Sequence, residues 1–183
     1  MALERRPIGT ERLVLEPIEP RHTAGIFSAA MSSVEHLLPW MPWVVGLTEE
    51  RISGFNDDAV IAWAEGRSYA FAMADGGRPI GVASLDVNHG GVGEVGYWIE
   101  AAHAGRGLAT EAARALLDLG FGVLSLYRVE LRAGVDNSRS VRVAEKLGFT
   151  REGILRHGLD GSEGPFDAYM FGMTKEDWAA GRG

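Results

Sequence analysis

Cysteine is absent from this 183-residue chain, which excludes disulfide bonds, thiolate metal ligands and cysteine nucleophiles together. No Lys/Arg cluster occurs, and with a net charge of −7 we expect neither nucleic acid nor an anionic membrane as a partner. No apolar run reaches the roughly 18 residues of a membrane-spanning helix. The first residues also lack an apolar signal core, and we therefore expect a cytoplasmic protein.

The composition is that of a globular protein, with 46% hydrophobic and 23% charged residues. Because no internal repeat or linker interrupts it, we expect a single domain over residues 1–183. The histidines show no ligand spacing such as His-x3-His, so we expect no metal.

The stretch over residues 94–110 has the pattern of an anion-binding turn. Its first half is an apolar run that predicts a strand, and a helical pattern begins at Leu108. Between them, Gly105 and Gly107 would let the backbone approach a ligand closely. The first helical turn offers unpaired N–H groups and the positive end of the helix dipole, and Arg106 adds a full charge.

Two known phosphate-binding patterns can be compared with this turn. The Walker A spacing is absent, which argues against a P-loop nucleotide hydrolase. The dinucleotide pattern Gly-x-Gly-x-x-Gly is half present, because Thr110 replaces its third glycine. An acidic residue, Glu130, lies on the next predicted strand, so a dinucleotide site stays an alternative. A plain strand-to-helix turn is another.

Periodicity predicts hairpins at both ends of the chain and one strand–helix–strand crossover in the middle. Predicted strands cover residues 10–18, 68–74, 79–87, 94–99, 127–135, 149–156 and 166–173. Predicted helices cover residues 22–30, 49–65, 108–124 and 137–147, with a short one after Thr174. A doubly wound fold would show several crossovers, so we expect a mixed α+β domain. Pro17 predicts an edge position for the first strand.

Several motifs occur in a characteristic order. They are Gly96-Tyr-Trp-Ile99, Gly105-Arg-Gly-Leu-Ala-Thr-Glu-Ala112, Asn137-x-x-Ser140, Glu145-Lys-Leu-Gly-Phe149 and Glu152-Gly153. This series resembles the GNAT superfamily of acetyltransferases, and more closely its RimJ/RimL branch, which acetylates the N-termini of ribosomal proteins. The segment from Leu37 to Trp43 is similar to that branch's Leu-x-x-Trp-x-Pro-Trp segment.

The resemblance implies an α+β, GNAT-type fold with a mostly antiparallel sheet of six to seven strands, flanked by helices. The sheet would splay between its fourth and fifth strands, predicted at 94–99 and 127–135. It also implies acetyl-CoA as co-substrate, with the pantetheine arm beside the fourth strand and the pyrophosphate on the glycine turn. The implied cofactor-binding residues are Trp98, Ile99, Ala104, Gly105, Arg106, Gly107, Leu108, Ala109, Thr110 and Asn137.

One position departs from the family's phosphate-loop pattern, because Ala104 stands where the family has Gln or Arg. We hypothesise that Arg106 supplies the missing charge.

The implied reaction is direct attack of a primary amine on a thioester within a ternary complex. Ser140 is the candidate donor to the departing thiolate, because the tyrosine that many members place four residues later is Ala144 here. Alternatively, Ser140 only bonds the first turn of its helix. Glu94 is the favoured general base, with a water chain as an equal rival and Glu130 as a second carboxylate.

Trp40 and Trp43 could wall the acceptor pocket, although packing in the core is the alternative for each. The acceptor would be a small-molecule amine or a protein N-terminus, and the resemblance implies a homodimer. Two other functions stay open at this stage: a non-catalytic acyl-CoA-binding or regulatory protein on the same scaffold, and a dinucleotide-binding oxidoreductase.

Overall fold

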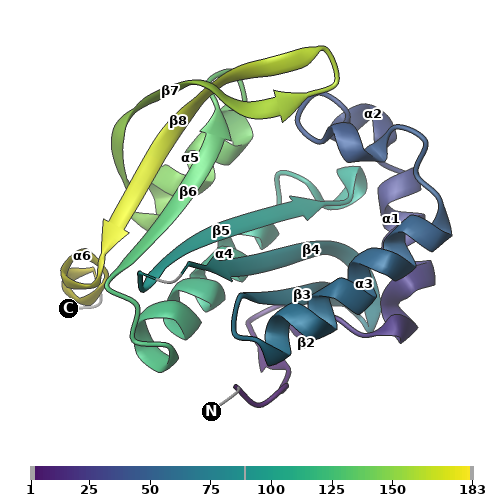
Figure 1. The fold of residues 1–183 in the computed structure, drawn as a ribbon, viewed down its shortest axis with the longest axis horizontal. Coiled ribbons are helices and arrows are strands. Elements are labelled where there is room, and N and C mark those ends of the chain that lie inside the picture. The colour runs from purple at the N-terminus through teal and green to yellow at the C-terminus, as the bar shows by residue number, and fades with distance from the viewer. Residues whose placement is uncertain (1–2, 89, 182–183) are drawn as a thin grey trace.

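Eight strands form one sheet in the computed structural model, which describes residues 3–88 and 90–181 (Figure 1). The strands are β1 (Ile8–Gly9), β2 (Val14–Pro17), β3 (Ser68–Asp75), β4 (Arg78–Val87), β5 (Val92–Ile99), β6 (Arg128–Gly134), β7 (Thr150–Gly161) and β8 (Gly164–Thr174). Their order in the sheet is β1-β2-β3-β4-β5-β6-β8-β7. Every neighbouring pair is antiparallel except β5 and β6. The expected mixed, mostly antiparallel α+β sheet is confirmed, with one strand more than the predicted range.

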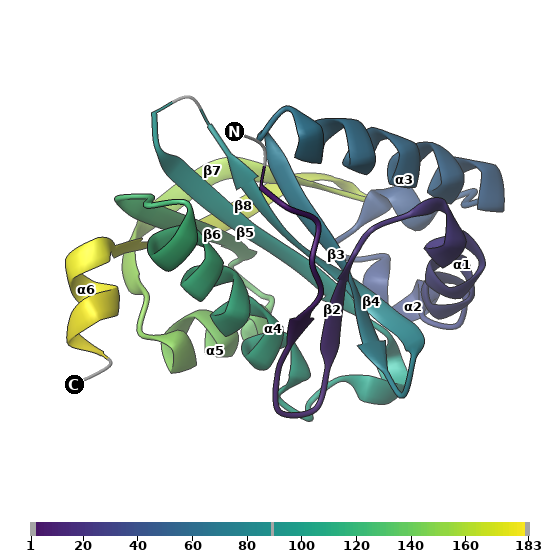
Figure 2. The ribbon, with the colours of Figure 1, turned by 90° about the horizontal axis from the view of Figure 1, so that it is seen from below.

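The helices lie on both faces of this sheet (Figure 2). They are α1 (Thr23–Met31), α2 (Val34–Leu37), α3 (Glu49–Ala64), α4 (Leu108–Leu117), α5 (Ser138–Leu147) and α6 (Lys175–Ala180). Short 3-10 turns occur at η1 (Pro20–His22), η2 (Pro42–Val44) and η3 (Ala101–His103), and α4 continues into a π-helical segment at η4 (Asp118–Val123). Figure 2 shows α1 and α3 on one side of the sheet and α4 and α5 on the other.

Each face of the sheet has its own apolar core. Strand β5 contributes side chains to both cores, because successive side chains of a strand point to opposite faces of the sheet. Trp98 packs in the core beneath α1 and α3, whereas Ile99 packs in the larger core beneath α4. Tyr97 also packs against that larger core. The alternation along this one strand thus decides which residues can reach a ligand from which side.

The edge position predicted from Pro17 is wrong for the start of its strand. The two residues of β1 pair with Val14 and Leu15, so β2 is an inner strand there. Pro17 lies beyond these pairs and faces β3 opposite Phe71. A proline is tolerated at a position where one side of the ladder has ended, because it has no N–H to donate.

The predicted parting of the sheet is present between β5 and β6. These two strands pair in parallel at only three positions, Val92 to Glu94 against Arg128 to Glu130. Beyond them, β6 continues along β8 and β5 continues along β4. Among residues 3–88 and 90–181, no strand therefore pairs with the edge of β5 from Val95 to Ile99 on the β6 side.

No described helix is long and apolar enough to cross a membrane.

Candidate active site

A cavity of about 560 Å3 lies where β5 and β6 part, and we call it the main cavity. It is bounded by β5, the turn before α4, the end of β6 and the first turns of α5. The predicted site residues that line it are Trp40, Glu94, Trp98, Ile99, Ala104, Gly105, Gly107, Leu108, Ala109, Thr110, Asn137 and Ser140. Arg106, Trp43 and Glu130 are not among its lining residues. The structure thus brings most of the predicted residues to one place.

The turn before α4 has the backbone that its glycines predicted. Gly105 and Gly107 adopt φ values of +76° and +81°, a left-handed conformation that side chains disfavour. Gly107 is the N-cap residue directly before α4, and the first hydrogen bond of that helix runs from the N–H of Glu111 to the Gly107 carbonyl. The N–H groups of residues 108–110 therefore stay outside the helical ladder at the rim of the main cavity.

The N-terminal segment holds this turn in place. The Arg12 guanidinium donates to the carbonyl of Arg106 at 2.8 Å and to the Glu111 carboxylate at 2.8 Å. Thr10 donates to the same carboxylate at 2.6 Å. Although burial raises the pKa of Glu111, these hydrogen bonds outweigh it and hold that pKa below its ordinary value. The backbone of Arg106 is thus fixed, and the use of its side-chain charge stays a hypothesis.

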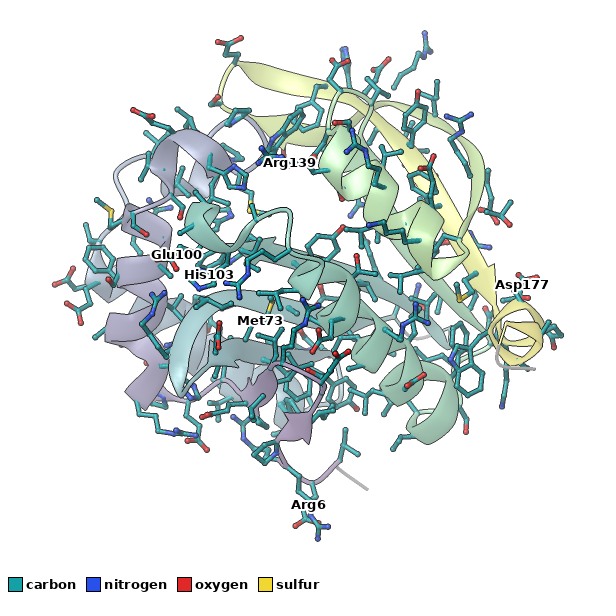
Figure 3. All side chains as sticks on the ribbon, turned by 180° about the vertical axis from the view of Figure 1, so that it is seen from behind. Arg6, Met73, Glu100, His103, Arg139 and Asp177 are labelled. Atoms are coloured by element: carbon teal, nitrogen blue, oxygen red, sulfur yellow. The ribbon has the colours of Figure 1, made fainter. Side chains whose placement is uncertain are left out.

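A buried carboxylate anchors the other end of the turn. Glu100 follows β5 and is only 8% exposed, and it accepts hydrogen bonds from Arg78 at 2.6 and 3.2 Å. Ser32, at the end of α1, donates to it at 3.0 Å, and Nδ1 of His103 lies 2.8 Å away (Figure 3). The hydrogen bonds from Arg78, followed by that from Ser32, hold the pKa of Glu100 below its ordinary value despite burial.

A hydroxyl pair bridges the two sides of the main cavity. The hydroxyl oxygens of Tyr97 on β5 and Ser140 on α5 lie 2.9 Å apart. The cap of α5 is formed by other atoms, because the side-chain oxygen of Asn137 accepts from the backbone N–H of Ser140 at 3.1 Å. Burial raises the pKa of Tyr97 to about 12, so its phenol stays protonated at neutral pH.

Tyr97 is a residue whose contact the sequence does not predict. It belongs to the Gly96-Tyr-Trp-Ile99 motif, and the alternation of side chains along β5 places it on the opposite face from Trp98. Its contact with Ser140 joins residues 43 positions apart, so no local spacing could have revealed the pair.

Both candidate carboxylates are held by arginines of β6. The oxygens of Glu94 accept from Arg132 at 2.7 and 3.0 Å. Glu130 lies opposite Glu94 in the parallel register and accepts from Arg128 at 2.8 Å. Glu94 lines the main cavity, as does Asp136 after the end of β6, a carboxylate that no sequence motif singled out.

The two tryptophans face different cavities. Trp40 lines the main cavity and meets Phe166 of β8 edge to face, with ring centroids 5.9 Å apart. Trp43 lies against Trp98 with centroids 5.7 Å apart and lines a second cavity. They separate because the 3-10 turn η2 begins between them, at Pro42. The sequence led us to expect Trp40 and Trp43 in the wall of one acceptor pocket, whereas each lines a different cavity.

The segment that carries these tryptophans crosses to the far side of the main cavity. Besides the Trp40–Phe166 contact, the ring of His36 on α2 lies 3.1 Å from the guanidinium of Arg139 on α5. Figure 1 shows α2 beside the end of the β7–β8 hairpin. Burial, and then the charge of Arg139, lowers the pKa of His36, so the ring is held neutral against the guanidinium.

No three His, Asp or Glu side chains gather to hold a metal ion within residues 3–88 and 90–181.

Known proteins share the sequence pattern and the fold of this chain. A family model described as an acetyltransferase (GNAT) domain matches residues 12–150, and the chain belongs to this family of N-acetyltransferases. The putative ribosomal N-acetyltransferase YdaF of Bacillus subtilis is 38% identical over 85 residues, 46% of each chain. The spermidine N(1)-acetyltransferase of Escherichia coli is 44% identical over 55 residues, 30% of each chain. The matches span about half the length of such curated relatives, or less.

Solved structures of the same fold extend over almost the whole chain. Mycobacterium smegmatis RimJ, in complex with CoA-disulfide, superposes with a TM-score of 0.86 at 24% identity, covering 97% of this chain and 95% of that one. A GCN5-related N-acetyltransferase from Brucella melitensis gives a TM-score of 0.82 at 26% identity, covering 98% and 83%. The predicted GNAT fold and its likeness to the RimJ/RimL branch are confirmed.

The Glu100 cluster predicts an acid-sensitive anchor. A carboxyl whose pKa is lowered on folding stabilises the fold above its ordinary pKa, and that contribution is lost as the pH falls from there through the lowered pKa. We expect Glu100→Gln to lower the free energy of unfolding by about 1–3 kcal/mol at pH 7, and the difference from wild type to shrink as the pH falls below the ordinary value of 4.5. Urea unfolding at several pH values measures both quantities.

The matched control is Glu65→Gln, because Glu65 pairs with Arg67 where both side chains are about half exposed. We expect this variant to lie within about 0.5 kcal/mol of wild type. An effect of Glu100→Gln that is the same at pH 7 and pH 3 would contradict the anchor.

Proposed function

We propose that the protein is an acetyl-CoA-dependent N-acetyltransferase that acetylates a primary amine by direct attack in a ternary complex. The observation that carries the proposal is that the glycine turn, the unpaired edge of β5 and Ser140 all border one cavity. Related structures support the choice of co-substrate, since RimJ of Mycobacterium smegmatis and a RimL acetyltransferase are in complex with CoA species. Protein N-termini are one acceptor class by the same likeness, and spermidine, for which an E. coli relative is named, is another.

The residues present fit such a co-substrate. The N–H groups of residues 108–110 would hold the pyrophosphate, since Gly105 and Gly107 carry no side chain of their own, and the nearest one to Gly107 is the guanidinium of Arg12. The free backbone edge beside Trp98 and Ile99 would pair with the amide groups of the pantetheine arm. Acetyl-CoA would supply an acetyl group activated as a thioester.

Ser140 and Tyr97 would together stabilise the departing thiolate. The Ser140 hydroxyl faces the main cavity, and it can donate onward only if its own oxygen accepts from Tyr97. Because the phenol stays protonated at neutral pH, it can fill that role throughout the working range. The pair would replace the tyrosine that many family members carry at the position of Ala144.

Water is the proton acceptor that the geometry favours for the amine. Each oxygen of Glu94 already accepts a hydrogen bond from Arg132, so this carboxylate is engaged in an ion pair and is not free to reach the amine. Asp136 is the other carboxylate of the main cavity. We expect Glu94→Gln and Asp136→Asn each to keep kcat within about fivefold of wild type. A loss of roughly 100-fold or more, the size expected for a general base, would identify that residue as the base instead.

The family assignment rules against the alternative of a dinucleotide-binding oxidoreductase. The alternative of a protein that only binds acyl-CoA is distinguished from an enzyme by measuring the release of free CoA in the presence of an amine. Self-association as a homodimer and a single domain over residues 1–183 stay predictions.

The phosphate site is tested by Gly107→Val against a matched control. Gly77 has φ of +82° in the β3–β4 turn, and a Cβ added there would meet no atom within 4 Å, so valine creates the same backbone strain away from the cavity. Calorimetric titration of acetyl-CoA should show at least a tenfold loss of affinity for Gly107→Val and little change for Gly77→Val. Equal affinities in the two folded variants would rule out this turn as the binding site.

The hydroxyl pair is tested by Ser140→Ala and Tyr97→Phe. Because the hydroxyls act on charge that develops in the transition state, we expect kcat to fall roughly 10- to 1000-fold for Ser140→Ala, and less for Tyr97→Phe. Acetyl-CoA affinity should stay nearly intact in both variants. The double variant should lose little more than Ser140→Ala alone, since the two groups act as one unit. Full activity of Ser140→Ala would show that the serine has no part in the chemistry.

A further inference from the structure

The second cavity has a volume of about 450 Å3 and lies on the α1–α3 side of β5. Its lining comes from α1, η2, α3, β4 and β5, and consists of Ile26, Met41, Trp43, Leu47, Arg51, Ile52, Phe55, Val82, Ser84, Gly96, Tyr97 and Trp98. Four of these residues also line the main cavity: Met41, Gly96, Tyr97 and Trp98. The two cavities therefore meet at the unpaired edge of β5, one on each side of the strand.

The lining of the second cavity is almost entirely apolar. Arg51 is the one charged side chain in it, and its guanidinium donates to the carbonyls of Val45 and Gly46 at 3.0 and 3.3 Å. No carboxylate is among the lining residues. The outer part of the second cavity is apolar too, because the side chain of Phe55 lines it and is 44% exposed.

We propose that the second cavity holds the acceptor and selects a primary amine carried on an apolar body, with no second positive charge. This inference rests on the proposed acetyltransferase function and adds the chemical class of its acceptor. The volume is within the range of small-molecule sites and would take an aromatic ring with a short aminoalkyl chain.

The shared residues explain how the amine reaches the other cavity. Gly96 has no side chain, and a Cβ there would lie 3.3 Å from the hydroxyl of Ser84 on the neighbouring strand. That position is closely bounded by Ser84, so an amino group from the Trp43 side would pass the bare backbone of Gly96, which lines both cavities. Tyr97, the next residue of β5, contacts Ser140, so the amine would arrive beside the proposed thiolate-stabilising pair.

The apolar lining also bears on the protonation of the amine. Removing an ammonium ion from water without a counter-charge favours its neutral form, and the neutral form is the nucleophile. Desolvation in the second cavity would therefore do part of the work of a general base. A smaller need for a general base agrees with the hydrogen bonds that tie Glu94 to Arg132.

A polyamine would meet the opposite conditions. Its additional ammonium groups would lose water without gaining a carboxylate, and they would lie near the positive charge of Arg51. The second cavity therefore disfavours spermidine, although a relative is named for that acceptor.

The test is a free-thiol assay of CoA release with acetyl-CoA and two probe amines, 2-phenylethylamine and spermidine. We expect kcat/KM for 2-phenylethylamine to exceed that for spermidine by at least tenfold. Equal use of the two amines, or a preference for spermidine, would overturn the inference while leaving the acetyltransferase function standing. Absence of CoA release with these amines and with a panel of N-terminal peptides, while acetyl-CoA binds, would instead refute the proposed function.

A matched pair of variants tests the location. Phe55→Asp places a carboxylate in the lining of the second cavity, whereas Ile61→Asp places one on the same helix at a side chain that is 53% exposed and lines neither cavity. We expect Phe55→Asp to lower kcat/KM for 2-phenylethylamine by at least fivefold, to raise it for spermidine, and to leave the KM for acetyl-CoA unchanged. Ile61→Asp should behave as wild type. Identical kinetics for the two variants would place the acceptor outside the second cavity.

Discussion

The parting of β5 from β6 after three paired residues is the feature on which the rest of the structure depends. A strand edge inside a folded protein leaves backbone N–H and C=O groups that need partners. Here that edge borders the main cavity on one side of β5 and reaches the second cavity on the other. Two reactants could therefore meet at one strand without either crossing the sheet. In our account, the bound pantetheine arm completes the hydrogen bonding that the fold leaves open.

The parted strands are held by polar contacts at one end and by aromatic packing at the other. Arg12 of the N-terminal segment holds the glycine turn through Glu111 of α4 and the carbonyl of Arg106, and Arg78 with Glu100 anchors the end of β5. At the far end, Trp40 packs on Phe166 across the cavity. These contacts join elements distant in sequence, so the cavity is shaped before any ligand arrives. Such pre-organisation lowers the cost of ordering the site on binding.

The parts of the site that depend on local geometry could be predicted from the sequence. Left-handed glycines at 105 and 107 and the Asn137 cap follow from neighbours in the chain. Pairs such as Tyr97 with Ser140, and Glu94 with Arg132, could not be predicted, because tertiary packing decides which strand faces which helix. The division of Trp40 and Trp43 between two cavities has the same cause. The family motifs indicated the parted sheet, whereas β1, at two residues, is too short to leave a periodic pattern.

Amide hydrogen exchange with and without acetyl-CoA tests the central claim most directly. If the co-substrate pairs with the free edge of β5, amides within residues 95–99 and in the turn over 105–110 should exchange more slowly when it is bound. Exchange in β3, which pairs on both sides, should change little, since its ladder is already complete. Tight binding of acetyl-CoA with no added protection in β5 or the turn would contradict the account.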